Sequence, residues 1–246
     1  MQYSLTCKQE YFLGENIMKH INENGRSMVE MLGVLAIIGV LSVGGIAGYS
    51  KAMNKYKINK TTDQVSMLVA NIRTLFSSQG NYDGLTNAQA IKFGVVPNDM
   101  YTKSDGTDMH NAFNGNVTIT AAKARAADGD SNSGKEAFII EYAGLSSEAC
   151  VTIATGDWGS GQASGLIGIA AGQESMTTAG TAGTLGGALK DVIIDADGAS
   201  EPKDGKVIAQ PGSATVATPI SVTDAVKACD GESNSGSGYG VAWKYY

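Results

Sequence analysis

Residues 25–41 read GRSMVEMLGVLAIIGVL, and the apolar run that starts there continues to Ala47. Between Met28 and Ala47 there are twenty residues, and Glu30 is the only charged one. At about 1.5 Å per residue, a helix of this length spans about 30 Å, the thickness of the hydrocarbon core of a bilayer. The segment therefore predicts a membrane-spanning helix with one carboxyl group.

Glu30 is the residue in this segment that requires an explanation. An ionised carboxylate in hydrocarbon costs a few kcal/mol, so such a residue usually has a partner and a role. The alternative is a cleaved secretory signal peptide, for which the small residues at 43–48 would supply a cleavage site. Against it, the chain carries Glu30 and continues without a proline until Pro97.

Gly25, Glu30 five positions later and the apolar helix after it resemble the class III signal of type IV prepilins. The resemblance implies that a membrane-embedded prepilin peptidase cleaves after Gly25 and N-methylates the new N-terminal residue, Arg26. It also implies that Glu30 neutralises the N-terminal ammonium group of a neighbouring subunit. The first mature residue in this family is typically apolar, such as Phe or Met, so Arg26 departs from the pattern.

The resemblance divides the chain into three parts. Residues 1–25 are the prepilin leader, although residues 18–25 alone would form a complete short leader, so Met18 is a second candidate start. Residues 26–50 are the transmembrane and assembly half of a long N-terminal helix. Residues 51–246 form the extracytoplasmic head, which includes a variable region at 150–229.

The residues from Lys51 to Phe76 predict that the helix continues with one apolar stripe. The residues expected to face a core are Val65, Leu68, Val69, Ile72, Leu75 and Phe76, and those expected to face out are Lys60, Asp63, Gln64, Asn71 and Arg73. A helix over residues 27–78 would be about 80 Å long. Because one domain cannot bury such a rod, its N-terminal half must lie in lipid or against copies of itself.

The remaining sequence predicts an α+β fold. A short helix is expected from Thr86 to Phe93, and residues 82–100 resemble the helix-to-sheet connection of type IVb pilins. Strands are predicted at 117–121, 137–142, 151–154, 192–194, 206–209 and 239–245. Residues 156–187 are rich in Gly, Ala, Ser and Thr and predict exposed loops. We expect the pilin fold, an antiparallel β-sheet packed on the C-terminal half of the long helix.

The cysteine count agrees with export. Cys7 leaves with the leader, so Cys150 and Cys229 remain as an even pair in an exported chain and predict one disulfide. Two free buried thiols are the alternative. The resemblance agrees with the disulfide, since pilins of this type carry one that bounds a variable region facing the filament exterior.

The composition argues against catalysis and nucleic-acid binding. The formal charge is −6, with 24 acidic against 18 basic residues, so no nucleic-acid partner is inferred. His110 is the single histidine of the mature chain and has no catalytic arrangement around it, so we predict a non-enzyme without a cofactor or metal. The acidic stretches at 128–134 and 195–204 imitate calcium loops but depart from their ligand pattern, which favours solvated turns.

The orientation of the apolar segment follows from the resemblance and not from charge. Lys19 and Arg26 precede the segment, but four lysines follow it within residues 51–60, and the positive-inside rule alone would place the C-terminal side in the cytoplasm. The prepilin resemblance requires the opposite orientation, and the cysteines favour an oxidising compartment. We therefore expect the head outside the cytoplasm.

The resemblance implies a structural subunit, specifically the major pilin, of a type IVb-like pilus. Such a subunit is anchored in the inner membrane of a Gram-negative bacterium and then becomes part of an extracellular filament. Its implied partners are copies of itself, the prepilin peptidase, the assembly platform, an ATPase and a secretin. The alternatives are a type II secretion pseudopilin and a minor tip pilin that acts as an adhesin.

Overall fold

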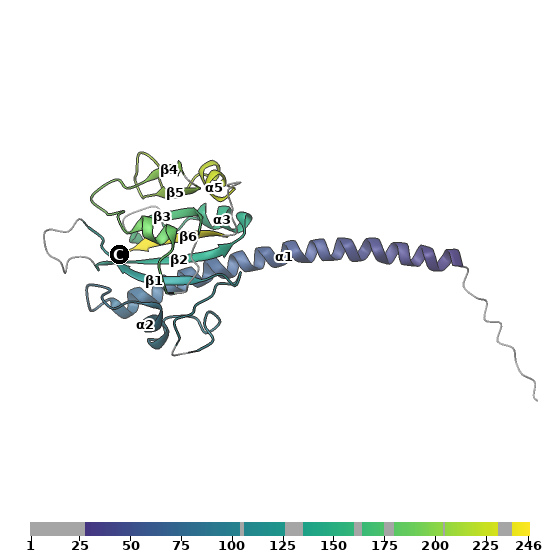
Figure 1. Ribbon diagram of the computed structural model, residues 1–246, viewed down its shortest axis with the longest axis horizontal. Helices are drawn as coiled ribbons and strands as arrows, with labels where there is room; N and C mark the ends of the chain where they lie inside the picture. Colours follow the sequence, from purple (N-terminus) through teal and green to yellow (C-terminus); the bar gives the residue numbers. More distant parts are fainter. Residues whose placement is uncertain are drawn as a thin grey trace, which may run out of the picture. The chain divides into compact units, whose positions relative to one another are not determined.

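The computed structural model describes residues 28–103, 106–125, 135–159, 164–174, 180–203, 205–230 and 238–246. The chain divides into two compact units, Met1–Gly48 and Tyr49–Tyr246. Helix α1, Met28–Phe76, begins in the first unit and ends in the second (Figure 1). The second unit, which we call the head, contains all the other helices and strands that the structure describes.

Within the head, α1 buries one stripe, as its pattern predicts. The buried residues are Ile58, Thr61, Gln64, Val65, Leu68, Ile72 and Phe76. Val69 is partly buried against the same core, whereas Leu75 is 37% exposed and lies at the edge of the predicted stripe. The prediction that Gln64 faces out is wrong. Its Nε2 donates to a carboxylate oxygen of Asp99 at 3.1 Å, which gives the buried amide a partner for its N–H group, whereas its Oε1 accepts no hydrogen bond from the described residues.

The sheet has six strands in the order β1-β2-β6-β3-β5-β4, and every pair is antiparallel. The strands are β1 Val117–Ala122, β2 Ala137–Leu145, β3 Leu166–Gln173, β4 Ser200–Lys203, β5 Lys206–Ala209 and β6 Tyr239–Tyr245. Strand β6 comes last in the chain yet pairs with both β2 and β3. The expected α+β fold with an antiparallel sheet and a long N-terminal helix is confirmed.

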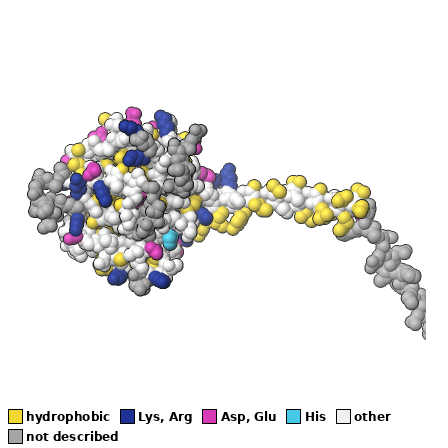
Figure 2. Space-filling view, viewed as in Figure 1, with side chains coloured by type: hydrophobic (Ala, Val, Ile, Leu, Met, Phe, Trp, Pro, Cys, Tyr) yellow, Lys and Arg dark blue, Asp and Glu magenta, His cyan; other side chains and the backbone are white. Residues whose placement is uncertain are grey.

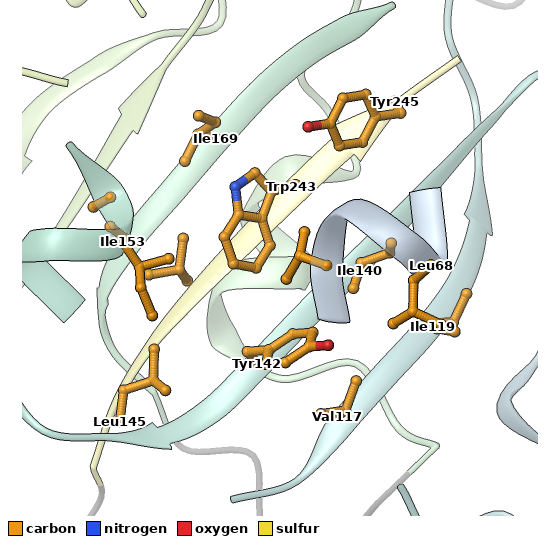
Figure 3. Close-up of a cluster of buried hydrophobic side chains, with 14 of the residues drawn as sticks. Leu68, Val117, Ile119, Ile140, Tyr142, Leu145, Ile153, Ile169, Trp243 and Tyr245 are labelled. Atoms are coloured by element: carbon orange, nitrogen blue, oxygen red, sulfur yellow. The ribbon is translucent and has the colours of Figure 1, made fainter. Parts of the chain in front are cut away.

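Two hydrophobic clusters cover the two faces of the sheet. The larger one unites α1, α2 (Asn87–Lys92), α3 (Ser147–Ala154) and α5 (Val222–Cys229) with the sheet, and the smaller one packs α4 (Thr184–Leu189) on the opposite face. Figure 3 shows Leu68 of α1 beside Ile119 and Ile140 in the larger cluster. Trp243 of β6 is fully buried there. Its ring packs edge-on against that of Tyr142, with the ring centres 5.8 Å apart.

Several predicted elements are confirmed, and two strands are wrong. The short helix begins after Thr86, whose hydroxyl caps it, and the strands predicted at 117–121, 137–142, 206–209 and 239–245 are present. Residues 151–154 instead belong to α3, because Ser146 caps a helix there by accepting from the amide of Ala149. Residues 192–194 lie outside the strands, where the backbone turns after α4.

The prediction of exposed loops at residues 156–187 is also wrong where the structure describes this range. It contains β3, which is almost completely buried, and the first four residues of α4, whereas 160–163 and 175–179 lie outside the described residues. The small residues of β3 are explained by close packing. A Cβ atom on Gly168 would lie 3.1 Å from Val192, and one on Gly172 would lie 2.1 Å from the carbonyl oxygen of Gly205. Glycine is therefore required by close neighbours and does not mark a solvated loop.

Candidate functional site

The N-terminal half of α1 exposes a surface that is apolar except for Glu30 and Ser42. All residues from Met28 to Gly48 are exposed, and hydrophobic side chains cover this part of the helix in Figure 2. Among the described residues, α1 is the one helix that is long and apolar enough to cross a membrane. In water this surface would be unfavourable at about 25 cal/mol per Å², so it requires lipid or protein to cover it.

Glu30 lies in the first turn of α1, where the helix dipole favours a negative charge. Its side chain is exposed and has no hydrogen-bond or ion-pair partner among the described residues. Gly25 and Arg26, the predicted cleavage and methylation positions, lie outside the described residues. The proposed pairing of Glu30 with an N-terminal ammonium group therefore stays a prediction.

The disulfide prediction is confirmed. Cys150 of α3 is bonded to Cys229 of α5, their Cα atoms are 5.9 Å apart, and both residues are fully buried. The bond joins two helices that pack on the same face of the sheet. The residues between the two cysteines include β3, α4, β4 and β5, so the bounded region supplies half of the strands of the sheet.

A buried pair of carboxylates holds the start of α4, which the sequence analysis missed. Glu141 of β2 accepts from the backbone N–H groups of Gly183 and Gly186, both at 2.7 Å. Glu174, directly after β3, accepts from those of Thr184 and Leu185 at 2.9 and 3.0 Å. Burial, with smaller contributions from the neighbouring Glu174, raises the pKa of Glu141 to about 8, although the two amides oppose the shift.

Lys244 of β6 completes the arrangement at the other end of α4. Its Nζ donates to the carbonyl oxygens of Leu189 and Lys190 at 2.9 and 3.1 Å and also to that of Val192. Burial lowers the pKa of Lys244 to about 8. Carboxyl groups accept from the backbone amides at the start of α4, and an ammonium group donates to the carbonyl oxygens at its end, so side chains from the sheet and its edge fix α4 at both ends.

A signal for Glu141 existed in the sequence. It stands inside the apolar run 137–145, just as Glu30 stands inside its own run. The backbone N–H groups of residues 183–186 donate to the carboxyl oxygens of Glu141 and Glu174, so these two side chains supply the acceptors at the start of α4.

The described residues contain no group of three or more His, Cys, Asp or Glu side chains placed to hold a metal ion. His110 forms an isolated bridge with Asn116 in the connection before β1. Asp197 accepts from the amide of Ala199 and from the hydroxyl of Ser213, as in a turn. The acidic stretch at 128–134 and Asp204 lie outside the described residues.

The long helix, the antiparallel sheet and the disulfide-bounded region define the class of the type IV pilins. A family model described as PilS N terminal matches residues 55–196, more than half of the chain, and the chain therefore belongs to this pilin family. The prepilin resemblance seen in the N-terminal sequence is thereby confirmed by a match to a different part of the chain.

Two relatives that are pilus proteins share about a quarter of their aligned residues with this chain. The chain is 25% identical over 139 residues to the "Major structural subunit of bundle-forming pilus" of Escherichia coli O127:H6, covering 56% of this chain and 67% of the relative. It is also 25% identical over 159 residues to the "Toxin coregulated pilin" of Vibrio cholerae, covering 63% of this chain and 67% of the relative.

Two solved structures are also similar. TcpA, a type IV pilin from the Vibrio cholerae El Tor biotype, has a TM-score of 0.47 at 20% identity, covering 78% of this chain and 99% of that one. A type IV b pilin from Salmonella typhi has a TM-score of 0.41 at 15% identity, covering 76% and 97%.

Proposed function

We propose that this chain is a structural subunit, specifically the major pilin, of a type IVb-like pilus. The observation that carries the proposal is the apolar segment of α1, in which every side chain from Met28 to Gly48 is exposed and Glu30 is the only charge. Relatives named as a major pilus subunit and as a pilin support the same role. The role is structural and requires no catalysis by this chain.

The proposed route begins with a precursor in the inner membrane of a Gram-negative bacterium. The prepilin peptidase cleaves after Gly25 and methylates Arg26, while the apolar segment stays in the bilayer. The assembly platform and its ATPase then move the subunit into the growing filament, which leaves through a secretin. In the filament the apolar segments cover one another, which removes their surface from both lipid and water.

Glu30 has a specific part in this route. Beside the N-terminal ammonium group of an adjacent subunit, its carboxylate gains an opposite charge in a region of low dielectric constant. Removing one partner of such a buried pair leaves the other uncompensated, which is strongly unfavourable. The pairing would therefore fix the position of each subunit relative to its neighbour.

The test is Glu30→Ala in the full chain, with Ser42→Ala as the matched control. Both changes remove a polar side chain from the apolar segment, but the Ser42 hydroxyl donates to the carbonyl oxygen of Ile38 within its own helix. We expect Glu30→Ala to be cleaved and to form the disulfide, yet to accumulate in the membrane without sheared surface filaments. We expect Ser42→Ala to assemble. Normal filaments from Glu30→Ala would overturn the role of this carboxylate.

The same preparation separates the alternatives. A major pilin is the dominant protein of sheared surface filaments. A secretion pseudopilin would be absent from them, and a tip adhesin would be present only in trace amounts.

A further inference from the structure

Four lysines follow the apolar segment of α1 without an acidic residue among them, and the structure separates them into two pairs. Lys60 forms an ion pair with Asp99 at 2.7 Å, and the Nζ of Lys57 lies 5.6 Å from the centre of an aromatic ring. Lys51 and Lys55 are exposed and have no ion pair among the described residues. Because they are four residues apart on one helix, their ammonium groups lie on one side of α1.

Two exposed tyrosines accompany these lysines. Tyr49 is 65% exposed and Tyr56 is 60% exposed. We call Tyr49, Lys51, Lys55 and Tyr56 the collar. Tyrosine and lysine are the residues that anchor a helix where hydrocarbon meets lipid headgroups, because each has an apolar body and a polar end. The core of the head uses none of these four side chains.

The spacing along α1 fits the headgroup layer. If Met28–Ala47 fills the hydrocarbon core, Lys51 lies about 6 Å and Lys55 about 12 Å beyond it at 1.5 Å per residue. The headgroup layer is about 5–8 Å thick on each side. Cα–Cβ bonds tilt toward the N-terminus of a helix, and long lysine side chains follow them, so both ammonium groups lean back toward the apolar segment. Both can reach the phosphate level.

The charge distribution points the same way. Residues 61–246 contain twenty Asp and Glu against eleven Lys and Arg, so the collar is a positive site in a head that is otherwise acidic. One acidic side chain of the described residues, Glu148, contacts this part of α1, where it accepts from the side-chain amide of Asn54 at 2.7 Å. The lysines also count against the proposed orientation under the positive-inside rule, so they require a role other than setting topology.

We propose that the collar binds the phosphate groups of anionic phospholipids in the membrane that holds the subunit before assembly. The inference rests on the proposed function, which places the apolar segment in a bilayer. Lys51 and Lys55 supply the charge, and Tyr49 and Tyr56 supply the interfacial anchors. The binding fixes the depth of α1 in the membrane, and it must be released when the subunit enters a filament.

The test uses the full chain reconstituted in phosphatidylcholine vesicles that contain a trace of spin-labelled lipid. The fraction of motionally restricted label is measured by electron spin resonance, once with labelled phosphatidylglycerol and once with labelled phosphatidylcholine. We compare the unchanged protein with Lys51→Gln/Lys55→Gln. The control is Lys92→Gln/Lys227→Gln, which removes the same charge from exposed positions on α2 and α5.

We expect the unchanged protein and the control to prefer phosphatidylglycerol over phosphatidylcholine by about fivefold for each lysine engaged. This preference should fall in about 0.5 M salt, because salt screens charges that are exposed to solvent. Lys51→Gln/Lys55→Gln should lose the preference. Equal restriction of both lipids by the unchanged protein would overturn the inference while leaving membrane anchoring intact. No restricted lipid at all would instead overturn the anchoring.

A third outcome concerns another partner. If Lys51→Gln/Lys55→Gln keeps the lipid preference but loses filaments, the collar contacts the acidic surface of a second copy and not lipid. That result would also overturn the inference.

Discussion

The disulfide allows a quantitative prediction. Cys150 and Cys229 are 79 residues apart in the chain, so the bond closes a long loop. In the chain-entropy model, a cross-link over a loop of this length stabilises the folded state by about 4.5 kcal/mol, through restriction of the unfolded chain. Domains are typically stable by only about 5–15 kcal/mol. Reduction should therefore remove a large share of the stability of the head.

The measurement is urea unfolding of the full chain in detergent micelles, followed by tryptophan fluorescence. Trp158 and Trp243 are the only tryptophans of the sequence, and their ring centres are 4.8 Å apart in the core of the head, so the signal reports on this unit. If the free energy of unfolding falls by about 2 kcal/mol per M urea, this loss of stability lowers the urea concentration at the midpoint of unfolding by about 2 M. The slope itself should rise, because the reduced unfolded chain exposes more surface.

The design separates the cross-link from packing. Comparison of the oxidised and reduced unchanged protein measures the bond, since both thiols stay in place. Comparison of the reduced protein with Cys150→Ala/Cys229→Ala measures the packing of two fully buried side chains. A loss of less than about 1 kcal/mol on reduction, with an unchanged slope, would refute the entropic reasoning.

Three further predictions concern the head, each measured by the same unfolding assay. Glu141→Gln should flatten the dependence of the free energy of unfolding on pH between about 4.5 and 8. In that range Glu141, with its raised pKa, holds more protons in the folded protein than in the unfolded chain, so the stability of the unchanged protein falls as pH rises. An equal slope in both proteins would contradict this. Gly186→Ala should lower the free energy of unfolding, because its Cβ would lie 2.4 Å from a carboxyl oxygen of Glu141. The Cβ of Gly187→Ala would have nothing within 4 Å, so this variant should be neutral or more stable by up to about 1 kcal/mol. Equal effects of the two changes would contradict the contact with the carboxyl group. Leu68→Ala, at a fully buried position, should cost about 2–5 kcal/mol and Leu75→Ala less than about 1; similar losses would contradict the buried stripe.

The long helix could be predicted because its signals are local. Its length and the presence of a single charged residue, Glu30, indicate the apolar half, and spacings of three and four indicate the buried stripe. Gln64 shows where this reasoning ends. Its amide is buried because Asp99, thirty-five residues away, supplies a partner, and no local pattern contains that information. Tertiary hydrogen bonds decide such positions.

Strand β3 was harder to predict because four of its eight residues are Gly or Ala and it lies in a stretch rich in small residues. Its glycines reflect the close approach of Val192 and Gly205. The prediction for residues 151–154 was wrong in the opposite direction: a strand was predicted where the structure has a helix, since a short β-branched run suits either element. There the cap at Ser146 and the packing of Cys150 determine the helix.

Two glutamates in apolar runs carry the same signal but have different environments. Glu141 finds its partners inside its own chain, where amides 42 and 45 residues away donate to both of its oxygens, and the price of burial appears as a raised pKa. Glu30 lies in a segment whose described residues are all exposed and offer its carboxylate no partner. A head that satisfies its buried acids so completely leaves Glu30 as the acid whose partner is to be sought outside the head. The proposed ammonium group of a neighbouring subunit is such a partner, and it gives one physical reason both for the charge in the apolar run and for assembly.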